Sequence, residues 1–468
     1  MHTRHASRLT IAAGICVAVS FIGSKTSAFP GCNNNVGPDV IVGDLQSISN
    51  YTNVGDIDAF SVGTYSCNIG NQNLPWVANS NNHPVIPQNM YRYRVVNGVG
   101  QFEQIGMSWL KHAFTALTDN ICCTCNGQGG AVLGVGCADP YTSGRNGTQL
   151  STTGGLGPRF DINAHSGAYT WPYPFRNNNG SVSVTSITRR VQVKTADLNP
   201  TLNPGAKYYV EAMYVTPSDC GLGNQDNNAS SRAITISGSD PNYTAALSGS
   251  TQREQPAIMF WKTNDPSVTL TEIAAPESDA GGTAHDVTSR IILGHKATDL
   301  GGGQWAYEYA MMNLNSDRSV DGFYVPIPAG AVVTSSGFHD IFYHSGDGFN
   351  STPTTQVNFD GTDWPAVVSS TQIAWDMVPA SPLGNSNAIR WGTMYNFRFV
   401  INAPPETGDI TFSQFKVDNT VVVHGVTRPG TDCDGNNVAD SVQIAGNPGL
   451  DANSNGVLDS CESAPCDA

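Results

Sequence analysis

A β-hairpin is predicted by residues 290–313, which read RIILGHKATDLGGGQWAYEYAMMN. Two runs rich in β-forming residues flank the turn-forming segment 299–303, a pattern typical of paired antiparallel strands. In the second run Trp305, Tyr307 and Tyr309 stand at alternate positions, and a strand therefore places all three on one face. The hairpin indicates a β-sheet with one aromatic face.

Similar short runs extend this β-domain along the chain. Tyr395, Phe397 and Phe399 again alternate, with Thr393 and Ile401 on the same side. Short strands at this spacing predict a β-sandwich over residues 255–428 with little helix. The further strands are expected at residues 321–328, 337–344, 372–378, 394–401 and 409–415.

The preceding block, residues 29–248, combines irregular loops with short β-forming runs, and we expect a cysteine-containing β-rich domain. One helix is predicted over Gln104–Leu117, because Met107, Leu110, Phe114 and Leu117 recur at helical spacing. Strands are expected at residues 55–62, 181–194, 207–215 and 232–237.

Composition supports a mainly β fold. Charged residues make up only 13% of the chain, whereas it contains 49 glycines and 27 prolines, which are turn formers. Hydrophobic residues at 39% and aromatic residues at 9% supply enough apolar surface for a core, and they argue against a disordered chain.

Residues 1–28 have the layout of a secretory signal peptide: basic residues, an apolar stretch and small residues before a cleavage point. We therefore expect an exported mature chain that begins near Phe29. Loss of Arg4, Arg8 and Lys25 leaves 20 basic and 38 acidic side chains, a net charge of −18. Such a charge argues against nucleic acid or anionic lipid as the main partner, and no mature stretch reaches the length of a transmembrane segment.

Ten cysteines remain in the mature chain, and export predicts that they form disulfides. The cluster Cys122, Cys123, Cys125 and Cys137 is also considered as a zinc site, although its C-C-x-C spacing suits a tetrahedral ion poorly. The other six are Cys32, Cys67, Cys220, Cys433, Cys461 and Cys466.

The last block, residues 430–468, carries the strongest motif. Residues 451–462, DANSNGVLDSCE, match the twelve-residue EF-hand calcium loop at positions 1, 3, 5, 6, 9 and 12. Gly456 allows the sharp turn, and the acidic position-12 side chain can close the shell with two oxygens. The predicted Ca²⁺ ligands are Asp451, Asn453, Asn455, the Val457 carbonyl, Asp459 and Glu462.

A first copy of the motif begins at Asp432. It departs from the pattern at Asn437, which stands where glycine is usual but tolerates a left-handed conformation, and at Gln443, which replaces the closing Glu. A neutral closing side chain predicts a weaker site. Its predicted ligands are Asp432, Asp434, Asn436 and Asp440.

The two loops resemble thrombospondin type 3 repeats and dockerin-like calcium repeats, because too few residues surround them for complete helix–loop–helix units. The body is similar to a family of secreted bacterial β-rich proteins to which no activity is assigned. That resemblance implies export and a calcium-binding tail, but no catalytic residue. It is carried by residues 42–45, 106–114, 133–147, 298–318 and 390–399.

Candidate sites elsewhere are weaker. His83, His112 and His165 are considered as copper or zinc ligands of the first domain, although no two share a spacing that puts ligands on one face. His339 and His344, with Asp340 and Asp347 nearby, need a bulge or turn for joint ligation. Arg145, Arg159, Asp139 and Asp161 are considered as binders of a polar ligand, against the simpler interpretation that they stabilise loops.

The sequence thus predicts a secreted or cell-envelope, non-enzymatic protein with a calcium-ordered C-terminal repeat and a structural, adhesive or attachment role. Its expected partners are calcium and an extracellular polysaccharide or cell-surface component. The alternative is a secreted metal-dependent hydrolase of extracellular polymer with a His-containing site in the N-terminal domain. A carbohydrate-binding module is the third hypothesis, suggested by the aromatic-bearing strands.

Overall fold

The hairpin of residues 290–313 is present in the computed structural model. Strands β15 (Thr288–Gly301) and β16 (Gln304–Asn313) pair antiparallel, with Asp299 opposite Trp305. The hairpin prediction is therefore confirmed. The structure describes residues 32, 35–112, 115–145, 159, 162–171, 185–277, 288–343 and 359–462.

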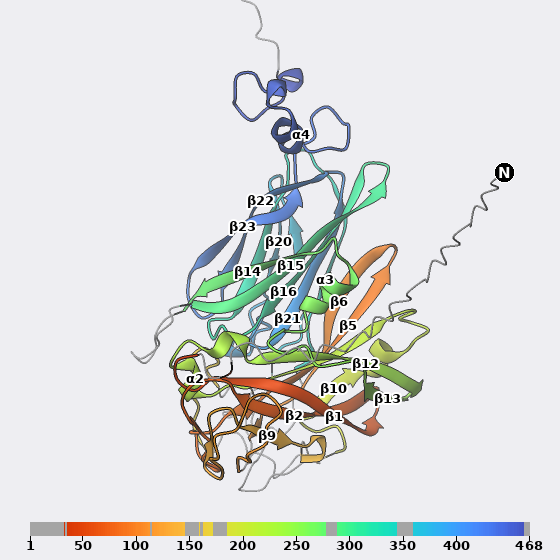
Figure 1. Cartoon of the computed structure of the whole chain (residues 1–468). Coiled ribbons are helices and arrows are strands. Elements are labelled where there is room, and N and C mark those ends of the chain that lie inside the picture. Colours follow the sequence, from red (N-terminus) through yellow and green to blue (C-terminus); the bar gives the residue numbers. More distant parts are fainter. Residues whose placement is uncertain are drawn as a thin grey trace, which may run out of the picture. The chain divides into compact units, whose positions relative to one another are not determined.

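This hairpin belongs to the first of two five-stranded antiparallel sheets, in which β14, β15, β16 and β21 lie side by side (Figure 1). Its strand order is β14 (Thr269–Pro276), β15, β16, β21 (Thr393–Ile401) and β18 (Val333–His339). The second sheet has the order β19 (Ala366–Val368), β20 (Gln372–Asp376), β17 (Val320–Pro326), β22 (Pro405–Gln414) and β23 (Thr420–Pro429).

Aromatic side chains join these two sheets into a sandwich. Tyr309 and Phe397 from the first sheet and Phe323 and Trp375 from the second share one buried core. The Phe323 and Phe397 rings stack with centroids 4.3 Å apart. The alternation of aromatic residues along β16 and β21 therefore predicted the buried face correctly, and the mainly β fold is confirmed.

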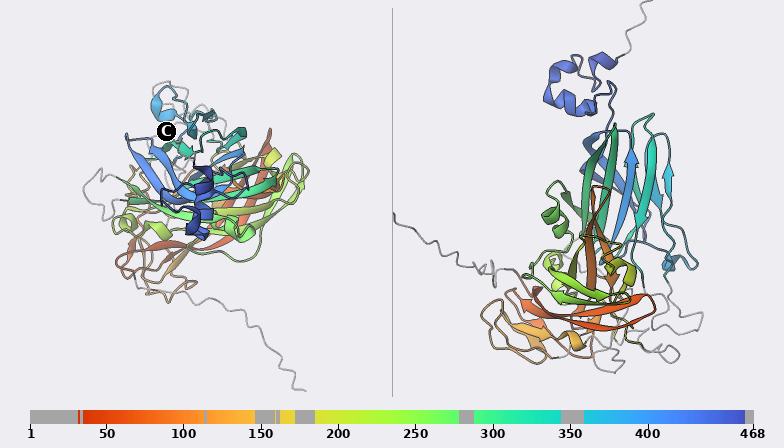
Figure 2. Two further views of the ribbon diagram at one scale, coloured as in Figure 1. Left: turned by 90° about the horizontal axis from the view of Figure 1, so that it is seen from above. Right: turned by 90° about the vertical axis from the view of Figure 1, so that its right-hand side faces the viewer.

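A nine-stranded antiparallel sheet is built from residues 40–247, and its long strands β1 and β2 are drawn in red in Figure 2. Three disulfides lie in this part of the chain: Cys32–Cys123, Cys67–Cys122 and Cys125–Cys137. The strands are β1 (Val40–Val54), β2 (Ile57–Asn68), β10 (Val191–Lys194), β6 (Val99–Met107), β5 (Gln88–Val96), β11 (Lys207–Met213), β12 (Ala229–Ser239) and β13 (Asn242–Leu247), with β9 (Ala138–Tyr141) paired to β2.

Two short two-stranded sheets and short helices complete the described elements. Strand β3 (Leu74–Pro75) pairs with β8 (Val132–Leu133), and β4 (Val85–Ile86) pairs with β7 (Lys111–His112). None of the helices in the described part of the chain combines the length and apolar character needed to cross a bilayer. The α-helices are α1 (Thr195–Leu198), α2 (Pro217–Cys220), α3 (Met259–Asn264) and α4 (Asp440–Gly446).

The predicted helix over Gln104–Leu117 is wrong. Residues 104–107 belong to β6, which pairs with β5 and β10, and β7 follows at Lys111–His112. Gly106 suits this strand, because a Cβ there would lie 2.7 Å from the Gln192 carbonyl oxygen of the neighbouring strand. The helical spacing was coincidental: Met107 and Leu110 pack in different cores, and Leu117 is 49% exposed. Phe114 lies outside the described residues.

Buried polar groups connect the nine-stranded sheet with the sandwich. Met394 of β21 donates its backbone N–H to the Gln104 side chain of β6 at 2.7 Å, and Asn396 donates to the Phe102 carbonyl at 2.8 Å. A buried cluster also combines residues of both parts, including Phe102 and Met312. Residues 31–468 accordingly form one compact unit.

Candidate metal site in the C-terminal loops

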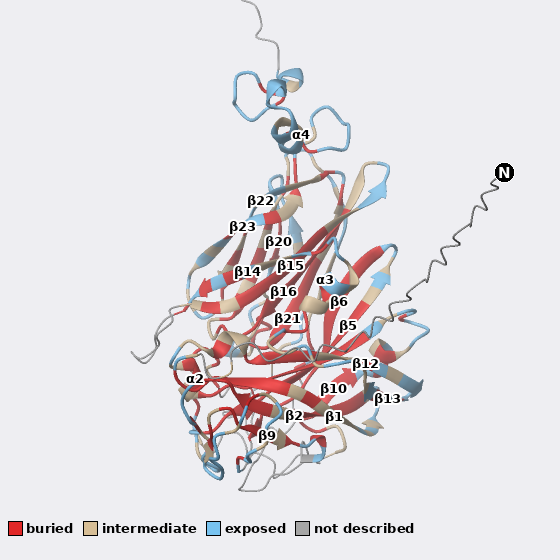
Figure 3. Ribbon diagram, in the orientation of Figure 1, coloured by how far each residue is buried: buried red, intermediate tan, exposed pale blue. Residues whose placement is uncertain are grey.

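The C-terminal loops, defined as residues 432–443 (loop 1) and 451–462 (loop 2), follow the last strand of the sandwich. Helix α4 begins within loop 1, at Asp440, the 3-10 turn η5 (Pro448–Leu450) lies between the two loops, and η6 (Asp459–Cys461) lies within loop 2. Most of this segment is exposed (Figure 3). At position 8 of each loop an apolar side chain, Ala439 or Leu458, is buried.

In loop 2 the position-1 carboxylate organises the backbone. Asp451 accepts the N–H of Asn455 at 3.0 Å on one oxygen and the N–H of Gly456 at 2.8 Å on the other. Asn453 accepts the Asn455 N–H, and Asn455 accepts the Val457 N–H. The backbone of loop 2 therefore turns around the side chains at positions 1, 3 and 5.

The closing residue reaches across this curl. The Glu462 carboxylate accepts hydrogen bonds from the side-chain amides of Asn453 at 2.7 Å and Asn455 at 2.6 Å. Positions 3 and 5 therefore both contact position 12, although Glu462 lies seven positions after Asn455. At position 9, the Asp459 carboxylate accepts the backbone N–H of Ala452 at 3.2 Å.

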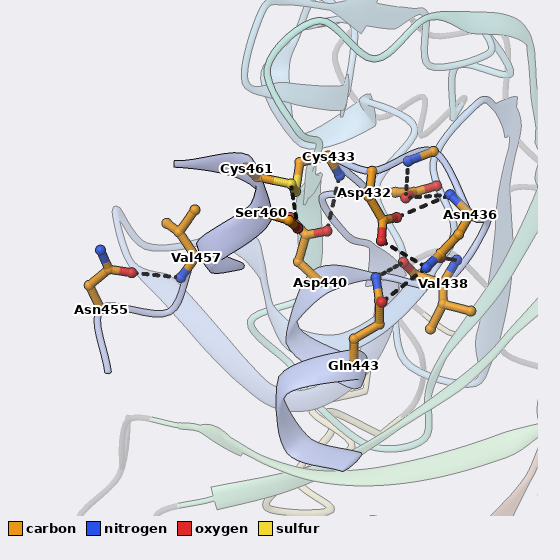
Figure 4. The surroundings of a disulfide bond; sticks show 12 residues. Asp432, Cys433, Asn436, Val438, Asp440, Gln443, Asn455, Val457, Ser460 and Cys461 are labelled. Carbon is orange, nitrogen blue, oxygen red and sulfur yellow. Dashed lines mark hydrogen bonds between the residues drawn. A yellow bond between two sulfur atoms is a disulfide. The ribbon is translucent and has the colours of Figure 1, made fainter. Parts of the chain in front are cut away.

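Loop 1 reproduces this arrangement, with the same residue types at positions 1, 5 and 9 and with Gln443 in place of glutamate at position 12. Asp432 accepts the N–H groups of Asn436 and Asn437 at 3.1 and 2.9 Å. The Asn436 amide donates to Gln443 at 2.9 Å, and Asp440 accepts the Cys433 N–H at 3.0 Å. Figure 4 shows these side chains around the disulfide. The residues at positions 1, 5, 9 and 12 therefore make equivalent hydrogen bonds in both loops.

Backbone conformation matches as well. Position 4 has a positive φ in both loops, +74° at Gly435 and +58° at Ser454. Position 6 does too, +66° at Asn437 and +83° at Gly456. The expectation that asparagine can replace glycine at the turn is therefore confirmed for Asn437, and it agrees with the tolerance of asparagine for this region.

The disulfide Cys433–Cys461 ties the two loops together, because it joins position 2 of loop 1 to position 11 of loop 2 (Figure 4). Ser441 at the start of α4 donates a hydrogen bond of 2.6 Å to Glu406 of β22. Thus one covalent bond holds the loops to each other, and a polar contact holds loop 1 to the sandwich.

The donor set suits a hard cation. Each loop offers carboxylate and amide oxygens together with a position-7 carbonyl, and Ca²⁺ prefers six to eight such ligands. Burial raises the pKa of Asp440, and the negative charges of Asp432 and Asp434 raise it further, against the hydrogen bond from the Cys433 N–H. A cation between these carboxylates would relieve their repulsion. Among the described residues, no three His, Cys, Asp or Glu side chains are gathered as ligands of one metal ion.

Of the histidine candidates, His83 and His112 lie against each other, whereas His165 and His339 have other hydrogen-bond partners. His83 and His112 stack with ring centroids 4.3 Å apart and bond to the carbonyls of Pro84 and Ser80. His165 instead contacts the Ser289 hydroxyl at 2.9 Å. His339 bonds to the Gln104 carbonyl at 2.9 Å. His344 and Asp347 lie outside the described residues.

The remaining candidates have structural partners. The zinc interpretation of the cysteine cluster is wrong, because all four cysteines form disulfides. The prediction that all ten mature cysteines form disulfides is wrong for Cys220, whose thiol is buried and not bonded to another cysteine. Arg159 donates to three backbone carbonyls and to Asn89, and Asp139 accepts the Leu117 N–H at 2.8 Å. Asp161, Cys466 and the Arg145 side chain are not among the described parts of the structure.

No protein-family model and no curated protein matches the chain. The resemblances to calcium repeats and to secreted β-rich proteins therefore rest on the residues themselves.

Proposed function

We propose that this chain is a secreted or cell-envelope, non-enzymatic protein whose C-terminal loops bind Ca²⁺. In this proposal the ion orders a tail that serves a structural, adhesive or attachment role toward a polysaccharide or another cell-surface component. Four disulfides support export, since such bonds persist in oxidising compartments.

The main support is the recurrence of one hydrogen-bond pattern in two loops of different sequence. In both, position 1 accepts the N–H groups of positions 5 and 6, and position 5 contacts position 12. The loops differ at positions 2, 3, 4, 6, 8, 11 and 12. What they share is aspartate at positions 1 and 9 and asparagine at position 5, and these side chains carry the oxygen donors that Ca²⁺ prefers.

Calcium titration of the mature protein by calorimetry tests this proposal. We expect two binding events, with Asp451→Ala removing one and Asp432→Ala removing the other. Asp418→Asn, an exposed acidic residue before β23, serves as a control and should leave both events unchanged. Absence of measurable Ca²⁺ binding at millimolar concentration, or binding that survives both loop substitutions, would refute it.

A further inference from the structure

A polar cleft of about 790 Å³ is lined by both the nine-stranded sheet and the sandwich. Gln104 of β6 and Lys194 of β10 line one wall, and His339 and Asp340 at the end of β18 line another. Ligand sites occur preferentially where two such parts meet, and this volume lies in their usual range.

Carboxylates outnumber cations in the lining of this cleft. Asp340, Asp360, Asp363 and Lys194 line the cleft, while Asp197 at the same cleft already pairs with Arg92 at 2.9 Å. Three carboxylates against Lys194 and His339 leave the lining net negative even when the His339 ring carries a charge. Such a lining repels phosphate, sulfate and carboxylate groups and attracts cations.

The carboxylate of Asp340 is the most enclosed of the three. It accepts a hydrogen bond from the Asn387 amide. Burial raises its pKa to about 6, the charge of Asp363 raises it as well, and His339 and Lys194 oppose the shift. A positively charged ligand group would offset this desolvation.

Hydrogen-bonding capacity in the cleft also favours a donor ligand. His339 Nε2 lies 2.9 Å from the Gln104 carbonyl oxygen. A carbonyl only accepts, so Nε2 donates this hydrogen bond. The oxygens of the three aspartates in the lining make the cleft rich in acceptors.

Aromatic rings complete the lining. Phe342 is 43% exposed, unusual for so large an apolar side chain, and lines the cleft together with Phe359. The Arg390 guanidinium already lies 4.2 Å from the centroid of the Phe359 ring. Cations bind favourably to aromatic faces, and one such contact is therefore present beside the cleft.

From charge, acceptor content and aromatic lining together, we propose that this cleft binds an organic cation carrying a guanidinium or primary ammonium group. The group would lie among Asp340, Asp363 and the ring of Phe342. The inference does not rest on calcium binding by the C-terminal loops, which are a separate part of the chain.

Calorimetric titration of the mature protein with agmatine, in calcium-containing buffer, tests the cleft. We expect saturable binding that Asp340→Asn and Asp363→Asn each weaken by about tenfold or more, because charge-assisted hydrogen bonds are lost. Asp418→Asn is the matched control outside the cleft and should bind as the unsubstituted protein does. Thermal unfolding establishes that each variant is folded, and Asp363→Asn, an exposed position, remains informative if Asp340→Asn is not.

Parallel titrations distinguish the source of the cation and the competing ligand class. A Gly-Arg-Gly peptide that binds more tightly than agmatine assigns the site to a protein segment, and the reverse order assigns it to a small molecule; either result supports the proposal. Three results would overturn it: no saturable agmatine binding at millimolar concentration, unchanged affinity in both aspartate variants, or displacement of agmatine by a neutral oligosaccharide.

Discussion

The two C-terminal loops differ in charge at position 3, with Asp434 in loop 1 and Asn453 in loop 2, and at position 12, with Gln443 in loop 1 and Glu462 in loop 2. Under the calcium proposal, Glu462→Gln removes a negative ligand and should weaken loop 2 by at least about tenfold, since charge count tunes such sites. Gln443→Glu should strengthen loop 1 by a comparable factor. Calcium titration of each variant measures both effects, and equal affinities before and after either exchange would contradict the assigned ligands.

Asp139 is 4% exposed and accepts the Leu117 N–H. Burial raises its pKa to about 7, and Asp119 raises it too, against that hydrogen bond. The folded state therefore holds this proton more tightly than the unfolded state, so the contribution to stability is present below pH 4 and is lost as pH rises toward 7.

Asp139→Asn keeps a hydrogen-bond acceptor and removes this titration. We expect the free energy of unfolding to fall less between pH 4 and pH 7 in the variant than in the unsubstituted protein. A tenfold difference in proton affinity corresponds to about 1.4 kcal/mol, so the difference is measurable by urea unfolding. If the free energy of unfolding changed with pH in the same way in both proteins, the raised pKa of Asp139 would be contradicted.

At the scale of single elements, α4 shows what calcium is proposed to do. The helix has only seven residues, Asp440–Gly446, which is too short for stability by itself. Its first residue is a proposed ligand of loop 1. Chelation of calcium should therefore accelerate amide hydrogen exchange in α4 and the C-terminal loops, because binding energy offsets the ordering of the chain.

The sheets provide the internal control for this exchange experiment. Exchange in β16 and β21, whose strands lie in the sandwich core, should not change on chelation. The disulfide Cys433–Cys461 keeps the loops covalently joined in both states. Uniform protection of α4 with and without calcium would mean that the disulfide and local packing suffice to order the tail.

Elements with a strict alternation of apolar residues were predictable from sequence, and those determined by distant partners were not. Trp305, Tyr307 and Tyr309 stand at alternate positions, and this alternation predicted both the hairpin and its buried face. The stretch after Gln104 carries a helical spacing, yet its backbone pairs with β5 and β10, and no local signal reports those partners. The loop conformations follow from short-range residues, including the left-handed Asn437. The cleft beside His339 escaped prediction because its residues come from segments more than 200 positions apart.

For the molecule as a whole, one buried carboxylate connects the nine-stranded sheet to the sandwich. Glu103 of β6 is fully buried and pairs with Arg92 at 2.6 Å and with Arg398 of β21 at 3.0 Å. Arg398 also pairs with Glu308 of β16 at 2.9 Å. Although burial raises the pKa of Glu103, the positive groups around it, including His339 and Arg398, hold that pKa well below its usual value.

Glu103→Gln should therefore be costly at neutral pH, because it removes the buried negative charge that Arg92 and Arg398 share and leaves them only Asp197 and Glu308 as ion-pair partners. Loss of one partner of such a buried pair typically costs about 3–5 kcal/mol. The depressed pKa means that the stabilisation is present above pH 5 and is lost as pH falls, so the variant and the unsubstituted protein should converge in acid. Denaturant unfolding at several pH values measures this cost.

The same network predicts that the two parts of the molecule are energetically coupled. In a double-mutant cycle, the double variant with Arg398→Met and Glu103→Gln should lose less free energy of unfolding than the sum of the two single losses. The reason is that Arg398→Met removes a positive charge whose partner Glu103→Gln has also removed. Lys416→Met, an exposed cation that pairs with Asp317 at 2.9 Å, is the control and should be additive with Glu103→Gln. If Arg398→Met were additive as well, the contact between β6 and β21 would carry no coupling, and packing of residues such as Phe102 and Met312 would be left to join the sheet to the sandwich.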